Sequence, residues 1–128
     1  MPLAHAIING ETVPVRVAET PRHRALGFQY VDRSTLSEER LLLRWDEPGR
    51  PSLHMRNVPG PLVAAWIDAS GEVVELQHME PGGSGYKPER PVVAVLEVSP
   101  EEARRLGLEP GVSVRVSSQV REPQQSVR

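Results

Sequence analysis

Cysteine is absent from this 128-residue chain, aromatic residues are scarce, and neither sign of charge dominates. The absence of cysteine excludes disulfides, thiolate nucleophiles and cysteine-ligated zinc sites. With two Trp, two Tyr and one Phe, the chain has little material for stacking on sugars or bases. The formal net charge of −2 arises from interspersed acidic and basic residues, so nothing points to nucleic acid or an anionic membrane as a partner.

Segments that direct a chain into or across a membrane are also missing. No apolar run is long enough to span a bilayer. Residues Met1 to His5 lack the basic and apolar regions of a signal peptide. We therefore expect a soluble protein that is not exported by that route.

The chain is rich in turn-forming residues: 13 prolines and 10 glycines fall between short apolar runs, as in strands joined by tight turns. Asn9-Gly10 suits a two-residue hairpin turn, and Asp68 to Gly71 has the composition of a hairpin loop. Pro14 lacks an N–H, which predicts a strand at a sheet edge or beside a bulge. The predicted strands are Ala6–Ile8, Thr12–Val17, Leu41–Leu43, Leu53–Asn57, Val63–Ile67, Glu72–Met79, Val92–Val98 and Val112–Val116.

Two short helices carry start and stop signals. Thr20 and Pro21 suit the beginning of a helix that Gly27 ends. Ser99 and Pro100 open a capping box, and that helix stops at Gly107. Residues 34–40 favour a turn or one helical turn, and residues 81–85 a flexible tip. The fold class is therefore mostly β (α+β): a small, partly closed barrel of about seven strands and two short helices over residues 1–116, with a polar tail over 117–128.

A series of landmarks in the middle of the chain resembles a known family. The landmarks are Gly27-Phe28-Gln29-Tyr30, Leu53 to Val58, Gly60 to Val63, Trp66-Ile67-Asp68, Gly71, Met79, Pro81, Tyr86, Val95-Leu96-Glu97, Gly107 and Gly111. Their order and spacing are similar to those of the domain of unknown function 192 family, from about Val15 to Val116. The resemblance implies a small β-rich barrel-like fold, and a sugar- or cyclodextrin-binding role has been attached to the family. His54, Val63 and Val112 stand where that family has Trp, Asp and Asp.

Five residues form the candidate ligand-binding set: His54, Arg56, Asn57, Tyr86 and Glu97. Glu97 shares a strand face with Val95, and a buried carboxylate needs donors or a raised pKa. Arg56 and Tyr86 are candidate partners for it. We favour an ion pair that closes the barrel over a general base, because no second catalytic group is identifiable.

Other chemistries have weaker signals. His54, His78 and Glu97 could converge on a metal if their strands were neighbours, but satisfied or solvent-facing histidines are the favoured interpretation. No Gly-x-Ser-x-Gly elbow is present, and Gly82 to Gly85 lack the features of a phosphate loop. The basic cluster Arg22 to Arg24 favours a solvated helix face. We predict no enzyme, no catalytic residue, no metal and no cofactor.

The leading hypothesis is a non-catalytic binding or interaction domain that takes a small polar ligand. One alternative is a structural subunit of a larger assembly, such as a virus-particle decoration or connector protein. In that case the partner is a protein or a second copy, bound through termini and loops. A second alternative is a carbohydrate-binding protein. The expected location is cytoplasmic or virion-associated.

Overall fold

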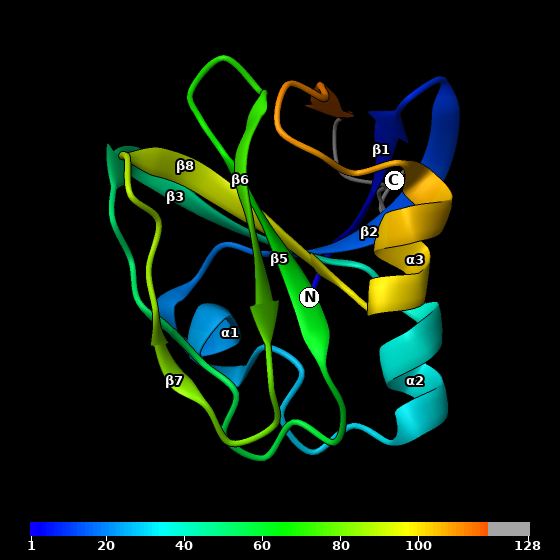
Figure 1. The fold of residues 1–128 in the computed structure, drawn as a ribbon, viewed down its shortest axis with the longest axis vertical. Coiled ribbons are helices and arrows are strands. Elements are labelled where there is room, and N and C mark those ends of the chain that lie inside the picture. Colours follow the sequence, from blue (N-terminus) through cyan, green and yellow to red (C-terminus); the bar gives the residue numbers. More distant parts are fainter. Residues whose placement is uncertain (118–128) are drawn as a thin grey trace, which may run out of the picture.

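The computed structural model describes residues 1–117, which form a seven-stranded sheet, a two-stranded sheet and three short helices (Figure 1). The helices are α1 (Pro21–Leu26), α2 (Arg33–Glu38) and α3 (Pro100–Leu106). The strands are β1 (Leu3–Ile8), β2 (Glu11–Ala18), β3 (Leu41–Gly49), β4 (Leu53–His54), β5 (Leu62–Ile67), β6 (Val73–Met79), β7 (Ser84–Tyr86), β8 (Val92–Val98) and β9 (Val114–Val116). The predicted mostly β fold is confirmed.

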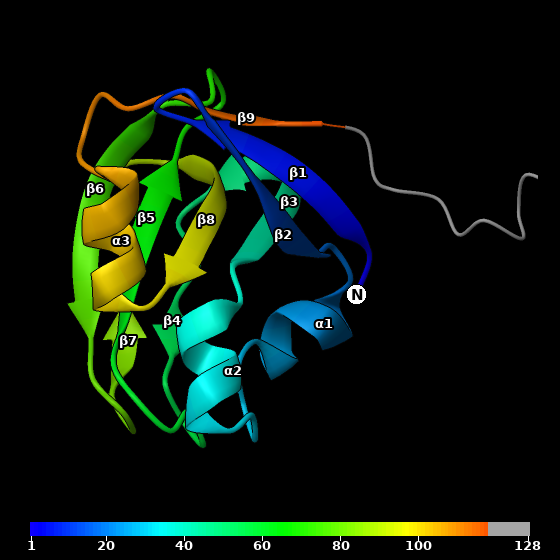
Figure 2. The ribbon, with the colours of Figure 1, turned by 90° about the vertical axis from the view of Figure 1, so that its right-hand side faces the viewer.

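The large sheet has the strand order β6-β5-β8-β3-β2-β1-β9 and curves into a half-barrel (Figures 1 and 2). Every neighbouring pair is antiparallel except β2 and β3, which run parallel. The edge strands meet at one end, where Glu72 bridges Ser113 and the Val73 N–H donates to the Val112 carbonyl at 2.8 Å. The half-barrel is thus joined at this end, which hides part of both sheet edges.

Two hydrophobic cores lie on opposite faces of the sheet. The first core includes Val63, Ala65 and Ile67 of β5, together with Ala103 and Leu106 of α3. The second core includes the alternate β5 residues and residues from β4, α2 and the segment after α1. All six β5 residues are buried, as the uninterrupted apolar run predicted.

Local signals set the helix boundaries. Thr20 Oγ1 accepts a hydrogen bond from the His23 N–H at 3.1 Å, and Ser99 Oγ accepts one from the Glu102 N–H at 3.2 Å. These caps confirm the two predicted helices. Asp32 caps α2 in the same way through the Thr35 N–H at 2.8 Å. Residues 33–38 therefore form a short third helix where the sequence allowed a turn or one helical turn.

The prediction that Pro14 marks a sheet edge or a bulge was wrong for the strand as a whole. Strand β2 lies inside the sheet, between β1 and β3. However, β3 pairs only with Arg16 to Ala18, so its pairing ends before it reaches Pro14. Proline is tolerated there because no β3 carbonyl requires its missing N–H.

Three further segments differ from their predictions. The strand predicted at Leu53–Asn57 ends at His54, because the chain turns over Met55–Val58, where the Val58 N–H donates to the Met55 carbonyl and Asn57 has a φ of 61°. Strand β6 has a bulge near its start: Trp66 pairs with Glu75 and Ile67 pairs with Val73, which leaves Val74 without a partner on β5. Val74 therefore packs against the second core, whereas Leu76 packs against the first. The predicted flexible tip is held in place: the Gly82 N–H donates to the Met55 carbonyl, and the Met55 N–H donates to the Gly83 carbonyl.

Residues 118–128 of the predicted polar tail lie outside the described residues. Ser117 donates its N–H to the His5 carbonyl at 2.8 Å. The helices within residues 1–117 are too short to cross a membrane.

Candidate functional site

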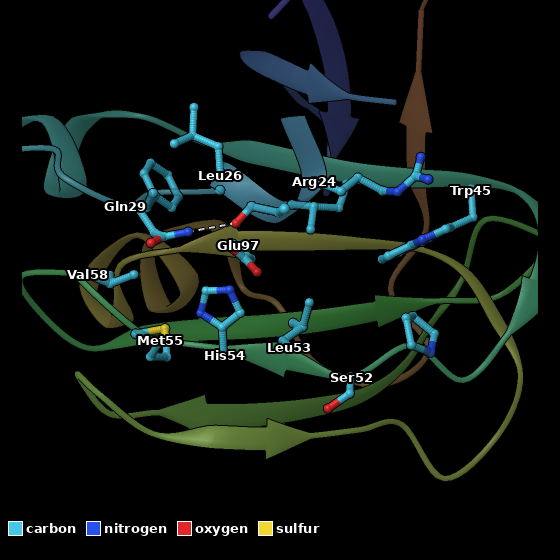
Figure 3. A pocket seen from close by; sticks show the side chains of 15 residues that line it. Arg24, Leu26, Gln29, Trp45, Ser52, Leu53, His54, Met55, Val58 and Glu97 are labelled. Carbon is cyan, nitrogen blue, oxygen red and sulfur yellow. Dashed lines mark hydrogen bonds between the residues drawn. The ribbon is translucent and has the colours of Figure 1, made fainter. Parts of the chain in front are cut away.

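A pocket of about 290 Å³ opens on the second-core side of the sheet, between α1 and β4 (Figure 3). The residues of α1 and the segment after it, Arg24 to Gln29, form one wall. Pro51 to Met55 and Val58 form the opposite wall, and β3 and β8 supply Leu43, Trp45 and Glu97. Segments far apart in the sequence therefore meet around one space.

Glu97 is the buried acid of this pocket. It lies on β8 between β5 and β3, opposite Ala64 and Leu41, and is 6% exposed. No side-chain hydrogen bond or ion pair from residues 1–117 reaches its carboxyl group. Burial raises the pKa of this carboxyl from 4.5 to about 7 because the charged form loses its hydration.

His54 enters the same pocket from β4, and Figure 3 shows it beside the Glu97 carboxyl. Its Nδ1 accepts the Arg56 N–H at 3.1 Å. Because Nδ1 is the acceptor, the neutral imidazole carries its proton on Nε2. His54 therefore offers a fixed N–H donor.

Arg24 and Trp45 form the rim of the pocket. The Arg24 guanidinium lies 5.5 Å from the centroid of the Trp45 ring, within cation–π distance. Its Nη1 donates to the backbone carbonyls of Glu19 and, at 3.1 Å, Arg44. These contacts attach α1 to β3. The sequence analysis predicted a solvated helix face for Arg22 to Arg24. Arg24 instead contacts β3 through these hydrogen bonds and the Trp45 ring.

A second attachment joins the two walls beside the pocket. The Asn57 Nδ2 donates to the Tyr30 hydroxyl at 2.9 Å and to Gln29 Oε1 at 3.1 Å. The Tyr30 N–H donates to the Asn57 carbonyl at 2.9 Å. Both Tyr30 and Asn57 have positive φ, 64° and 61°. Non-glycine residues adopt this conformation at an energetic cost, which the mutual hydrogen bonds offset.

The structure brings two of the five predicted site residues together, His54 and Glu97. Arg56 is exposed and does not pair with Glu97 within the described chain. Asn57 braces the wall from outside the pocket. Tyr86 lies on β7, where its hydroxyl accepts the Glu80 N–H at 3.0 Å. The proposed ion pair of Glu97 with Arg56, or a contact with Tyr86, is therefore not made.

The metal hypothesis finds no support in residues 1–117. No three His, Asp or Glu side chains in this range are close enough together to hold an ion. His78 is exposed on β6 and does not line the pocket of His54 and Glu97.

Sequence reasoning missed the α1 wall and the rim residue Trp45. The Thr20-Pro21 signal indicated a helix but not what it covers. The Phe28 and Gln29 landmarks of the family pattern were the available signal, since both line the pocket.

The fold places this chain among small β-rich half-barrel proteins, and residues 1–117 hold a pocket with a buried acid on the second-core side of the sheet. Among known families, the profile of DUF192, described as an uncharacterized ACR, matches residues 4–116. The chain belongs to the DUF192 family, which confirms the resemblance noted in the sequence.

Two solved structures share the fold. One is from Sinorhizobium meliloti 1021 and is described provisionally as a transcription regulator; it has 22% identity and a TM-score of 0.77, covering 90% of this chain and 92% of that one. The other is a protein of unknown function from Novosphingobium aromaticivorans DSM 12444, with 24% identity and a TM-score of 0.73, covering 88% and 83%. At these identities the likeness shows the fold alone. The comparison with curated proteins finds no match.

Proposed function

We propose that this protein is a non-catalytic binding domain that takes a small polar ligand in the pocket between α1 and β4. The observation that carries the proposal is the Glu97 carboxyl, which is buried, faces the pocket and has no side-chain partner within residues 1–117. An unpaired buried acid is destabilising unless something satisfies it. A ligand that donates hydrogen bonds is the missing partner.

The arrangement favours binding over catalysis. General acid–base chemistry needs a second group positioned against the first. His54 is the nearest candidate, but its Nδ1 is engaged by the Arg56 N–H, and no hydrogen bond joins His54 to Glu97 in the described chain. Glu97 therefore offers an acceptor and His54 a fixed donor, which is a recognition pattern.

The alternative of an assembly or virion subunit places the partner contacts at termini and loops, and residues 118–128 lie outside the described part of the chain. A carbohydrate-binding role gains little from the pocket, because its polar groups are few. Neither alternative is carried by a specific observation.

A pocket-filling variant tests the proposal. Ala25 is exposed at the pocket wall, so Ala25→Phe should fill the opening without straining a core. A panel of small amines, alcohols, amides and acids is screened by amide NMR against the full chain. We expect at least one compound to shift the resonances of His54 and Met55, to be recovered unchanged, and to lose this effect in Ala25→Phe.

Ala69→Phe is the matched control, since Ala69 is exposed in the β5–β6 turn, outside the pocket. The control should bind as the natural chain does. If no compound in the panel distinguishes Ala25→Phe from Ala69→Phe, the pocket is not a binding site and the proposal fails. Turnover of a bound compound would contradict the non-catalytic part.

A further inference from the structure

The polar groups that line the pocket are few, and some are already occupied. Arg24 donates from Nη1 to two backbone carbonyls and lies over the Trp45 ring. Gln29 donates from Nε2 to the Ala25 carbonyl at 2.8 Å and accepts from Asn57 through Oε1. Its amide is thus used at both ends.

Three further polar side chains line the pocket: Ser52, His54 and Glu97. Only Glu97 can carry a negative charge. It is more than nine-tenths buried, and Figure 3 shows its carboxyl directed into the space. Ser52 has no side-chain hydrogen bond within residues 1–117 and lies on the same side of the pocket as Leu53.

The rest of the lining is apolar. Its larger side chains include Phe28, Leu43, Trp45, Leu53, Met55 and Val58. An apolar lining with one acid suits a ligand with a single cationic head and an apolar body. A monosaccharide fits less well, because its several hydroxyls would exceed the available partners and remain unsatisfied.

We propose that the pocket binds a small primary amine, whose ammonium group pairs with Glu97 and whose apolar body lies against Phe28 and Leu53. This inference rests on the proposed function, since it names the ligand class of the same site. The ammonium donates to the Glu97 carboxylate, which is directed into the pocket. A charge-assisted pair of this kind is about twice as strong as a neutral hydrogen bond.

The other charges around Glu97 permit this pairing. From β5 and β3 its opposite neighbours are the apolar Ala64 and Leu41. The titratable groups that line the same pocket are Arg24 and His54. Figure 3 shows the Arg24 guanidinium directed toward Trp45 and away from Glu97. Burial raises the pKa of Glu97 to about 7, so the carboxylate needed for pairing forms as the pH rises through neutrality.

The test compares three compounds of similar shape and different head group: phenethylamine, phenethyl alcohol and hydrocinnamate. Each is titrated into the full chain at about pH 8 and followed by amide NMR. We expect phenethylamine to bind about tenfold more tightly than the alcohol, because only the ammonium forms a charge-assisted pair. We expect this preference to shrink toward unity at about pH 5, where Glu97 is protonated while the amine stays charged.

Glu97→Gln keeps the shape and removes the charge, so the preference for the amine should disappear. Glu101→Gln is the matched control, because Glu101 is exposed on α3 and outside the pocket. The preference should persist there. The pH series on the natural chain gives the same answer without any variant.

Other outcomes overturn the amine proposal. Equal or tighter binding of the alcohol refutes the charge pairing but leaves a binding pocket. Preferential binding of hydrocinnamate assigns the site to an anion held by Arg24. Absence of binding by all three compounds also refutes the amine, and the Ala25→Phe comparison with the broader panel then decides the proposed function separately.

Discussion

At the scale of single residues, the burial of the Glu97 carboxyl opposes folding, because the charged form loses its hydration. Because side chains alternate between the two faces of β8, Glu97 points to the same side as Val95, which belongs to the second core. There it lies among apolar neighbours at the wall of the pocket. The strand that carries it, Val92–Val98, is otherwise apolar. Such an unpaired buried acid is typical of functional positions, where stability is lost in favour of binding.

The pH dependence of stability should report this burial. Below pH 4.5 the carboxyl is protonated in both states, and between 4.5 and about 7 the unfolded chain releases its proton first. The native state therefore binds more protons in that window, so the free energy of unfolding falls as the pH rises through it. The full effect is at most about 3.5 kcal/mol, since one pKa unit corresponds to about 1.4 kcal/mol.

Urea unfolding at about pH 4 and about pH 8 checks this prediction. Glu97→Gln should be more stable than the natural chain at the higher pH and should lose this component of the slope. Glu101→Gln should keep the slope. An unchanged slope in Glu97→Gln would show that Glu97 titrates as a hydrated acid.

At the scale of elements, helix α3 is attached to the sheet by apolar contacts and by a charged chain. Ala103 and Leu106 pack on the first core. Glu102 pairs with Arg40 at 2.6 Å and with Arg105 at 2.7 Å. These contacts lower the pKa of Glu102, the hydrogen bond from Arg105 being the largest cause. Glu102, the acidic residue of the predicted capping box, therefore pairs with two arginines, which the sequence pattern alone did not indicate.

A double-mutant cycle measures the Arg40–Glu102 contact. Its side chains are only 16% and 12% exposed, so water screens the pair weakly. We expect a coupling free energy of about 1–2 kcal/mol when both residues are replaced by alanine. The Arg16–Glu39 pair, at 3.5 Å and with exposures of 47% and 40%, is the control and should give less than about 0.5 kcal/mol. Equal couplings in the two pairs would contradict the difference in burial.

At the scale of the whole molecule, the half-barrel depends on contacts between its two edge strands. The Gly111 N–H donates to the Val73 carbonyl, and the Val114 N–H donates to the Gly71 carbonyl, both at 2.8 Å. These two hydrogen bonds join the segment from Gly111 to Val114 to the β5–β6 hairpin. This junction limits the exposed edge and holds the first core closed.

Amide hydrogen exchange tests the junction in solution. The amides of Val73, Gly111 and Val114 should be protected about as strongly as those of β5 and β8, because they open only when the barrel opens. The Glu72 amide, which bonds only to the nearby Asp68 carboxylate at 3.1 Å, is the internal control and should exchange faster. Exchange of the three junction amides at the Glu72 rate would mean that the edges separate readily.

The predictions that held depend on contacts within a few residues. Thr20 and Ser99 cap helices whose first turns follow directly. Asn9 and Gly10 take positive φ in the predicted hairpin, and the apolar run of β5 is buried on both faces. The predictions that failed depend on the rest of the molecule. Period-two alternation beyond His54 was broken by the Met55–Val58 turn, which carries Arg56 away from the pocket.

The sequence by itself determined the Asn9-Gly10 turn, the caps of α1 and α3, the buried strand β5 and the burial of Glu97, because steric preference and the alternation of side chains act over short distances along the chain. Only the tertiary structure decided that α1 and β4 enclose that acid, that His54 joins it, and that no arginine within residues 1–117 neutralises it. These residues are separated by tens of positions. Their meeting depends on how a curved sheet packs against a helix with no buried residue of its own.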